Sequence, residues 1–286
     1  MSWLDSVAER RFMVALGLVG LVASGYVLYA ARQAWRKAAG QRARNRPKPT
    51  RPRYSGAGET CAALGVGALK AVAAREPVDV HAYRCPARSI RARFREEFGG
   101  DDARENYPRA VRALLGSQAE VVAPGLRLVE EALRQRVRVG GELWAHALEE
   151  YATARGLPFA ERETLLSVAT QIASAEDRMR LDGILREGDR IPSLLARHWA
   201  EGVDLVRAGL RTRWLSEHEG REYLDRAGEL AAKWYQDWPT LFGALLLPAY
   251  LADDVREAEW GAAVGRQLLT DARSPLRVPL GPVSMR

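Results

Sequence analysis

Hydrophobic residues recur at helical spacing from about residue 58 to residue 270 of this 286-residue chain. Glycines, prolines and capping residues divide this region into expected helices over residues 58–75, 86–98, 107–116, 125–137, 142–155, 159–186, 192–214, 217–236, 239–252 and 254–270. Only residues 77–83 resemble a short strand. The pattern predicts an all-α fold, an irregular multi-helix bundle over residues 58–270, with an extended, proline-containing tail over residues 271–286.

Several helix ends carry recognisable capping signals. Ser216 and Glu219 have the spacing of a capping box, in which each side chain satisfies the backbone amide of the other. Pro192 suits the first turn of a helix, because proline has no amide hydrogen to leave unsatisfied there. These signals set the expected starts of the helices 217–236 and 192–214.

A different pattern precedes the bundle. Residues 12–31 form a stretch of twenty residues without a charged side chain. A helix of that length spans roughly 30 Å, the thickness of a bilayer hydrocarbon core. A cleaved signal peptide would have a shorter apolar region, and a buried core helix is rarely apolar all round. We therefore expect a single N-terminal transmembrane helix over residues 12–31, preceded by a short extracytoplasmic N-terminus, residues 1–11.

The net charge of +7 is concentrated in one linker. Residues 32–57 are rich in arginine and proline, and nine cations with no acidic residue lie between residues 32 and 53. Since residues 1–11 carry equal numbers of acidic and basic side chains, residues 54–286 have a net charge of −2. A domain of that charge lacks the electrostatic footprint of a phosphate-backbone binder, so no specific nucleic-acid partner is expected.

The same cations predict an orientation. Two cations precede residues 12–31 and nine follow them closely, which places the C-terminal side in the cytoplasm and the N-terminus outside. The expected contacts with anionic lipid headgroups at the membrane surface are Arg32, Arg36, Lys37, Arg42 and Arg44.

The expected helix 192–214 has an apolar stripe with a charged edge. Trp199, Val203, Val206, Leu210 and Trp214 form the stripe, and Asp204, Arg207 and Arg211 follow one edge of it, at the boundary between core and solvent. One interpretation is an ion pair that fixes helix packing. The other is a polar site on the wall of a groove, to which Arg213, Trp214 and Trp238 would also contribute.

Part of the chain resembles the bacterial domain of unknown function family 1266. The resemblance is clearest over residues 190–260 and is carried by Asp204-Leu205-Val206-Arg207, Arg213-Trp214, Glu219, Tyr235-Gln236-Asp237-Trp238 and Tyr250-Leu251; residues 94–117 add a fainter match. Asp237 stands where the family commonly has serine, and Leu215-Ser216 replaces an aromatic-glycine pair. The resemblance implies an α-helical bacterial domain, sometimes membrane-tethered, and implies no activity.

Motifs for catalysis and for cofactor or metal binding are missing from the sequence. No nucleophile elbow, dinucleotide loop or phosphate-binding loop occurs. Cys61, His81 and Cys85 could approach one zinc ion, but a fourth ligand is lacking, so no metal and no cofactor are expected. These observations favour a membrane-tethered interaction or accessory domain, with a protein partner at the bacterial inner membrane. The alternative is a membrane-anchored enzyme that binds a phosphate- or carboxylate-bearing ligand through Asp204, Arg207, Arg211 and Arg213.

Overall fold

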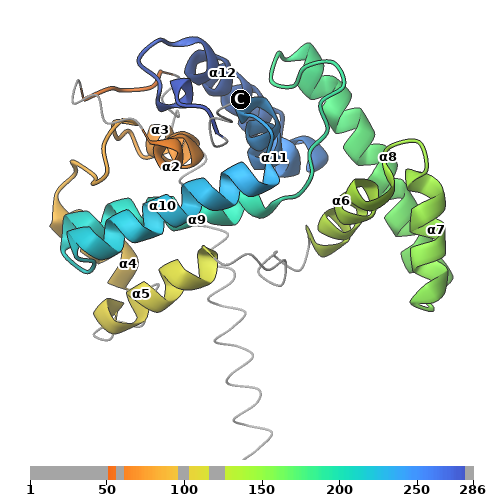
Figure 1. Cartoon of the computed structure of the whole chain (residues 1–286), viewed down its shortest axis with the longest axis horizontal. Helices are drawn as coiled ribbons and strands as arrows, with labels where there is room; N and C mark the ends of the chain where they lie inside the picture. Colours follow the sequence, from red (N-terminus) through yellow and green to blue (C-terminus); the bar gives the residue numbers. More distant parts are fainter. Residues whose placement is uncertain (1–50, 56–60, 96–102, 116–125, 281–286) are drawn as a thin grey trace, which may run out of the picture. The chain divides into compact units, whose positions relative to one another are not determined.

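Helices dominate the computed structural model, which describes residues 51–55, 61–95, 103–115 and 126–280 (Figure 1). The eleven α-helices of the described residues are α2 (Ala62–Val66), α3 (Ala68–Ala73), α4 (Ala87–Arg95), α5 (Ala103–Leu114), α6 (Arg127–Val139), α7 (Trp144–Ala154), α8 (Phe159–Leu181), α9 (Leu195–Thr212), α10 (Glu217–Trp234), α11 (Trp238–Leu251) and α12 (Val255–Thr270). No strand occurs among these residues; an isolated parallel bridge joins Arg53 and Pro77. The expected all-α, multi-helix fold is confirmed, whereas the short strand expected over residues 77–83 is wrong.

The expected membrane anchor, residues 12–31, lies outside the described residues, as do the N-terminus before it and the linker cations up to Lys48. Within the described ranges, every helix is too short or too polar to cross a bilayer.

Helix α9 is the centre of the bundle. It packs against α2, α3, α4, α5, α10 and α11, and it is buried on nearly every face. Helix α10 lies alongside it and makes the most extensive of these contacts (Figure 1). The close approach requires glycine: a Cβ on Gly220 of α10 would lie 2.5 Å from a methyl carbon of Leu210. The expected apolar stripe thus belongs to a helix that is buried on nearly every face, because the loop of residues 76–85 also covers its polar edge.

A second group of helices, α6, α7 and α8, packs mutually and joins the rest through α8 and α11 (Figure 1). Helix α11 in turn packs against α12. Apolar side chains from both groups belong to one continuous core, which extends from Leu133 and Leu148 through Trp199 to Phe242. One core is consistent with a single folding unit for this part of the chain.

Two expected helices and the tail differ in the structure from the prediction. The first is divided at Gly67, where a Cβ would lie 2.4 Å from a methyl carbon of Val203. The helix expected over residues 159–186 ends at Leu181, because Gly183 adopts a left-handed conformation (φ 71°) that terminates it. The tail after Thr270 is not extended throughout, since Pro275–Arg277 form a 3₁₀ turn that buries Leu276.

The helix expected to start at Pro192 begins instead at Leu195. Two buried carboxylates hold the preceding segment outside the helix: Glu176 accepts a hydrogen bond from the Ile191 amide at 2.8 Å, and Glu130 accepts one from the Leu194 amide at 2.7 Å. Both partners come from helices α8 and α6, so the start of α9 is set by tertiary contacts. The capping box at Ser216 and Glu219, by contrast, is formed as expected.

Candidate functional site

The charged edge of α9 faces the loop of residues 76–85. Asp204 is 3% exposed and Arg207 is 1% exposed, so neither lies at the solvent boundary that the sequence suggested. The Tyr83 hydroxyl donates to the Asp204 carboxylate, and Nη2 of Arg207 donates to the Pro77 carbonyl. The Arg207 guanidinium also lies over the Tyr83 ring, 4.7 Å from its centroid. These contacts fasten the loop to α9.

Further hydrogen bonds hold the same loop along its length. Nε of Arg211 donates to the Cys85 carbonyl at 2.8 Å, and the Tyr83 amide donates to the Arg207 carbonyl at 3.3 Å. Within the loop, Glu76 accepts from the amides of Arg84 and Cys85, at 2.7 and 3.0 Å. Thus Asp204, Arg207 and Arg211 meet along one face, where they bind the chain's own loop.

Burial perturbs both buried charges. Burial raises the pKa of Asp204 to about 6, against the opposing effect of Lys70 and Arg207. Burial also lowers the pKa of Arg207 to about 10, although Asp204, Glu76, Asp79 and Cys61 favour its charged form. Within the described residues, Nε and Nη1 of Arg207 have no hydrogen-bond partner. Two of the donors of this guanidinium are thus buried without an acceptor.

The other residues expected at the groove lie elsewhere. Arg213 is exposed just past the end of α9, in the left-handed conformation (φ 60°) that terminates the helix. Trp214 is half-buried and meets the Tyr107 ring of α5 edge-on, with the centroids 5.0 Å apart. Trp238, at the start of α11, donates from Nε1 to the Val278 carbonyl at 2.9 Å. The lipid-facing cations Arg32, Arg36, Lys37, Arg42 and Arg44 lie outside the described residues.

Two of the three residues considered as zinc ligands do approach each other. The Cys61 sulfur lies 3.8 Å from Nε2 of His81, across twenty residues of sequence. Cys85 is directed to the Glu76 carboxylate instead, and neither cysteine forms a disulfide. Where side chains are described, no three histidine, cysteine or acidic residues are grouped so as to hold a metal ion.

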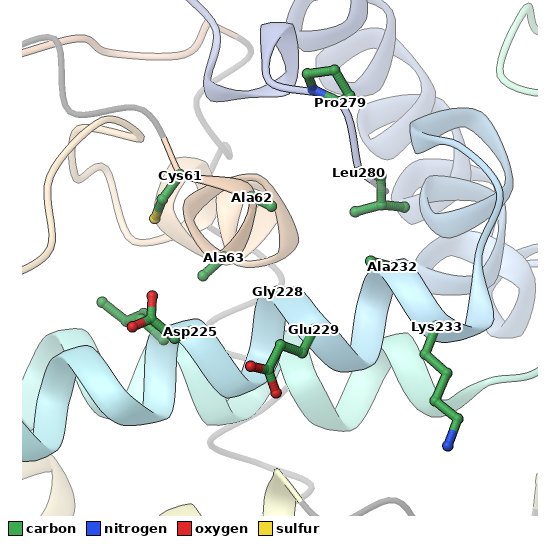
Figure 2. Close-up of a pocket in the computed structure, with 11 residues that line it drawn as sticks. Cys61, Ala62, Ala63, Asp225, Gly228, Glu229, Ala232, Lys233, Pro279 and Leu280 are labelled. Atoms are coloured by element: carbon green, nitrogen blue, oxygen red, sulfur yellow. The ribbon is translucent and has the colours of Figure 1, made fainter. Parts of the chain in front are cut away.

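A groove of about 760 Å³ runs between α2, α10 and the segment that follows the 3₁₀ turn (Figure 2). Its apolar lining consists of Ala62, Ala63, Leu224, Gly228, Ala232, Pro279 and Leu280. Figure 2 shows Asp225, Glu229 and Lys233 along α10, with Cys61 at the start of α2. Sequence reasoning missed this groove, because its lining comes from three distant segments. The small residues Gly228 and Ala232, four apart on one face of α10, were its only local signal.

A smaller pocket of about 500 Å³ lies between α6, α7 and α8. Its most buried charges are paired with each other: Arg136 makes two hydrogen bonds to Glu176, at 2.9 and 2.6 Å, and a third to the Ile191 carbonyl at 2.9 Å. The Trp144 ring covers this guanidinium at 4.5 Å. Arg136 and Glu176 therefore act as a buried brace for the segment before α9, and their charges are paired with each other.

Comparison with known proteins gives one match. The model of the family described as "Protein of unknown function (DUF1266)" matches residues 71–280, which include α9, the loop of residues 76–85 and most of the groove. No curated protein and no solved structure matches the chain. The family match extends well beyond residues 190–260, where the sequence resemblance was clearest. This chain therefore belongs to the DUF1266 family, and its α-helical bundle is the domain that the family model describes.

Proposed function

We propose that this protein is a membrane-tethered interaction domain that binds a protein partner in the groove between α2 and α10. The groove is the observation that supports the proposal: it is open, large enough for several side chains, and lined by small apolar residues. Such a lining admits the backbone or apolar side chains of another chain at close range.

The rim of the groove indicates the chemistry of that partner. Asp225 and Glu229 both project from α10, and Lys233 lies one turn beyond them (Figure 2). An apolar segment flanked by lysine or arginine would fill the groove and place its cations near the two carboxylates. Charge complementarity of this kind favours the correct register and suppresses acidic competitors.

The tether rests on the sequence. The uncharged residues 12–31 and the cations that follow them support an anchor with the domain on the cytoplasmic face of a bacterial inner membrane. The linker cations, from Arg32 to Arg44, would contact anionic headgroups. Confinement to that face raises the effective concentration of the groove toward membrane-associated partners.

The enzymatic alternative had Asp204, Arg207, Arg211 and Arg213 as its polar centre, and Arg213 lies exposed past the end of α9. The other three side chains bind Tyr83, the Pro77 carbonyl and the Cys85 carbonyl, all from the loop of residues 76–85. Nε and Nη1 of Arg207 have no partner among the described residues, but this side chain is only 1% exposed, so a phosphate or carboxylate would not reach them. The contacts therefore favour an interaction domain over that enzyme.

One experiment tests the groove and the tether together. The full-length protein is expressed with an affinity tag, extracted in mild detergent and purified with its partners. Ala232→Arg puts a long cation into the groove, and Ala160→Arg makes the same change at an exposed position of α8. We expect a protein with an apolar, basic-flanked segment to co-purify with the wild type and Ala160→Arg, and not with Ala232→Arg. Equal recovery of the partner with both variants would refute partner binding in the groove. A full-length protein that stays soluble without detergent would refute the membrane tether.

A further inference from the structure

The two cysteines of the chain have opposite surroundings. Cys61 is half-buried at the start of α2, lines the groove, and has its sulfur 3.8 Å from Nε2 of His81. Cys85 is equally half-buried but faces the Glu76 carboxylate. Burial and that carboxylate raise the pKa of Cys85 to about 11, which keeps it a neutral thiol. Of the two cysteines, Cys61 therefore has an imidazole beside its sulfur, whereas Cys85 has a carboxylate that disfavours its thiolate.

Charged groups of both signs surround Cys61. Arg207 of α9 lies near enough for Cys61 to favour its charged form, and two of its donors are unsatisfied in the part of the chain that is described. The acidic neighbours on the loop are held by other groups: Asp79 accepts from the Ser55 amide at 2.6 Å, and Glu76 accepts from two amides. Across the groove, α10 presents Asp225 and Glu229 (Figure 2). The His81 imidazole, 3.8 Å from the sulfur, is thus the basic group beside Cys61, and Arg207 is a cationic neighbour on α9.

We propose that Cys61 and His81 form a thiol–imidazole pair that makes Cys61 a reactive site for thiol–disulfide exchange at the end of the groove. The inferred ligand class is a small disulfide. The pair is assembled by the fold, because α2 and the loop of residues 76–85 both pack on α9. His81 lies within the range of the family match and Cys61 lies before it.

The exchange needs no other reactant. The Cys61 proton passes from sulfur to Nε2 of His81, and the resulting thiolate attacks one sulfur of the disulfide. A new S–S bond forms to Cys61 while the original S–S bond breaks. The departing thiolate takes up the proton from the imidazolium, so one disulfide and one thiol give a mixed disulfide and a new thiol. This inference holds whether or not the groove binds a partner.

The test compares the two cysteines within the wild-type full-length protein. The protein is treated with oxidised glutathione at pH 7, and peptide mass spectrometry follows the adduct at each cysteine over time. We expect Cys61 to react at least about tenfold faster than Cys85, after allowing for the greater nucleophilicity of a high-pKa thiolate. In guanidinium chloride the difference should disappear. Equal rates in the folded protein would overturn the proposal.

The pH dependence tests the role of His81. A simple thiol loses about tenfold in rate for each pH unit below its pKa, whereas a thiolate–imidazolium pair keeps its thiolate. Between pH 7 and pH 6 we expect the rate of adduct formation at Cys61 to fall less than threefold in the wild type. In His81→Gln the same rate should fall about tenfold. Identical profiles would overturn the pair. If circular dichroism shows that His81→Gln is unfolded, the pH profile of the wild type is used alone. A tenfold fall in the Cys61 rate of the wild type between pH 7 and pH 6 would then overturn the pair.

Discussion

Replacing Asp204 by asparagine removes a buried negative charge while keeping an oxygen that can accept the Tyr83 hydroxyl. The folded-state pKa of Asp204, about 6, lies above its ordinary value of 3.8 because burial disfavours the carboxylate. The folded protein therefore binds this proton more tightly than the unfolded chain does. Stability from this group is fully present below about pH 4 and is lost as the pH rises through 6.

The size of the effect follows from the shift. A difference of about two pKa units corresponds to about 3 kcal/mol, at about 1.4 kcal/mol per unit. Urea unfolding of the full-length protein in detergent, followed by tryptophan fluorescence, gives the free energy of unfolding at each pH. We expect the free energy of unfolding of the wild type to fall relative to that of Asp204→Asn by about 2–3 kcal/mol between pH 4 and pH 7.5.

The difference between the two proteins isolates Asp204, because other titrating groups are common to both. Glu130, whose pKa is also raised by burial, contributes equally to each curve. If the free energies of unfolding of the two proteins changed in parallel across this pH range, the raised pKa of Asp204 would be refuted. A change of opposite sign would mean that the carboxylate is stabilised by Arg207 and Lys70 more than burial penalises it.

Four other substitutions test the packing and the helix caps. Gly65→Ala should cost about 1–3 kcal/mol, because its Cβ would lie 2.4 Å from the Trp238 ring, whereas Gly228→Ala has 3.6 Å of room and should be tolerated; urea midpoints compare the two. Glu130→Ala should lower the free energy of unfolding by about 2–4 kcal/mol, since it leaves the Leu194 amide and the Ser193 hydroxyl without their 2.7 Å partners; unchanged stability would contradict a role for Glu130 in holding the segment before α9. Ser216→Ala should cost about 1 kcal/mol by removing the cap of α10, a loss that thermal unfolding would detect.

Local patterns were sufficient to predict the helices. Hydrophobic spacing placed all the longer ones to within a few residues, and the Ser216–Glu219 spacing identified the start of α10. Long-range contacts account for the failures. The start of α9 depends on Glu130 and Glu176, which lie on other helices, and the break at Gly67 depends on Val203. Residues that act at such distances leave no local pattern to detect.

The candidate site was predictable only in part. The spacing of Asp204, Arg207 and Arg211 showed that they share one face, but the loop that covers this face comes from more than 100 residues earlier in the chain. Cys61 and His81 were considered together for their chemistry, and the structure brings them within 3.8 Å. The groove of Figure 2 could not be predicted, because its shape depends on how α2, α10 and the final segment pack.

Site-specific photo-crosslinking in intact cells tests the proposed function most directly. A photoreactive amino acid at Ala232, inside the groove, is compared with one at Arg226, an exposed residue of the same helix that does not line it. We expect a discrete adduct from position 232 and none from 226, with mass spectrometry locating the crosslink in an apolar segment flanked by lysine or arginine. The Glu229→Lys change should weaken that adduct. The same adducts from both positions, or none from position 232, would contradict a partner-binding groove.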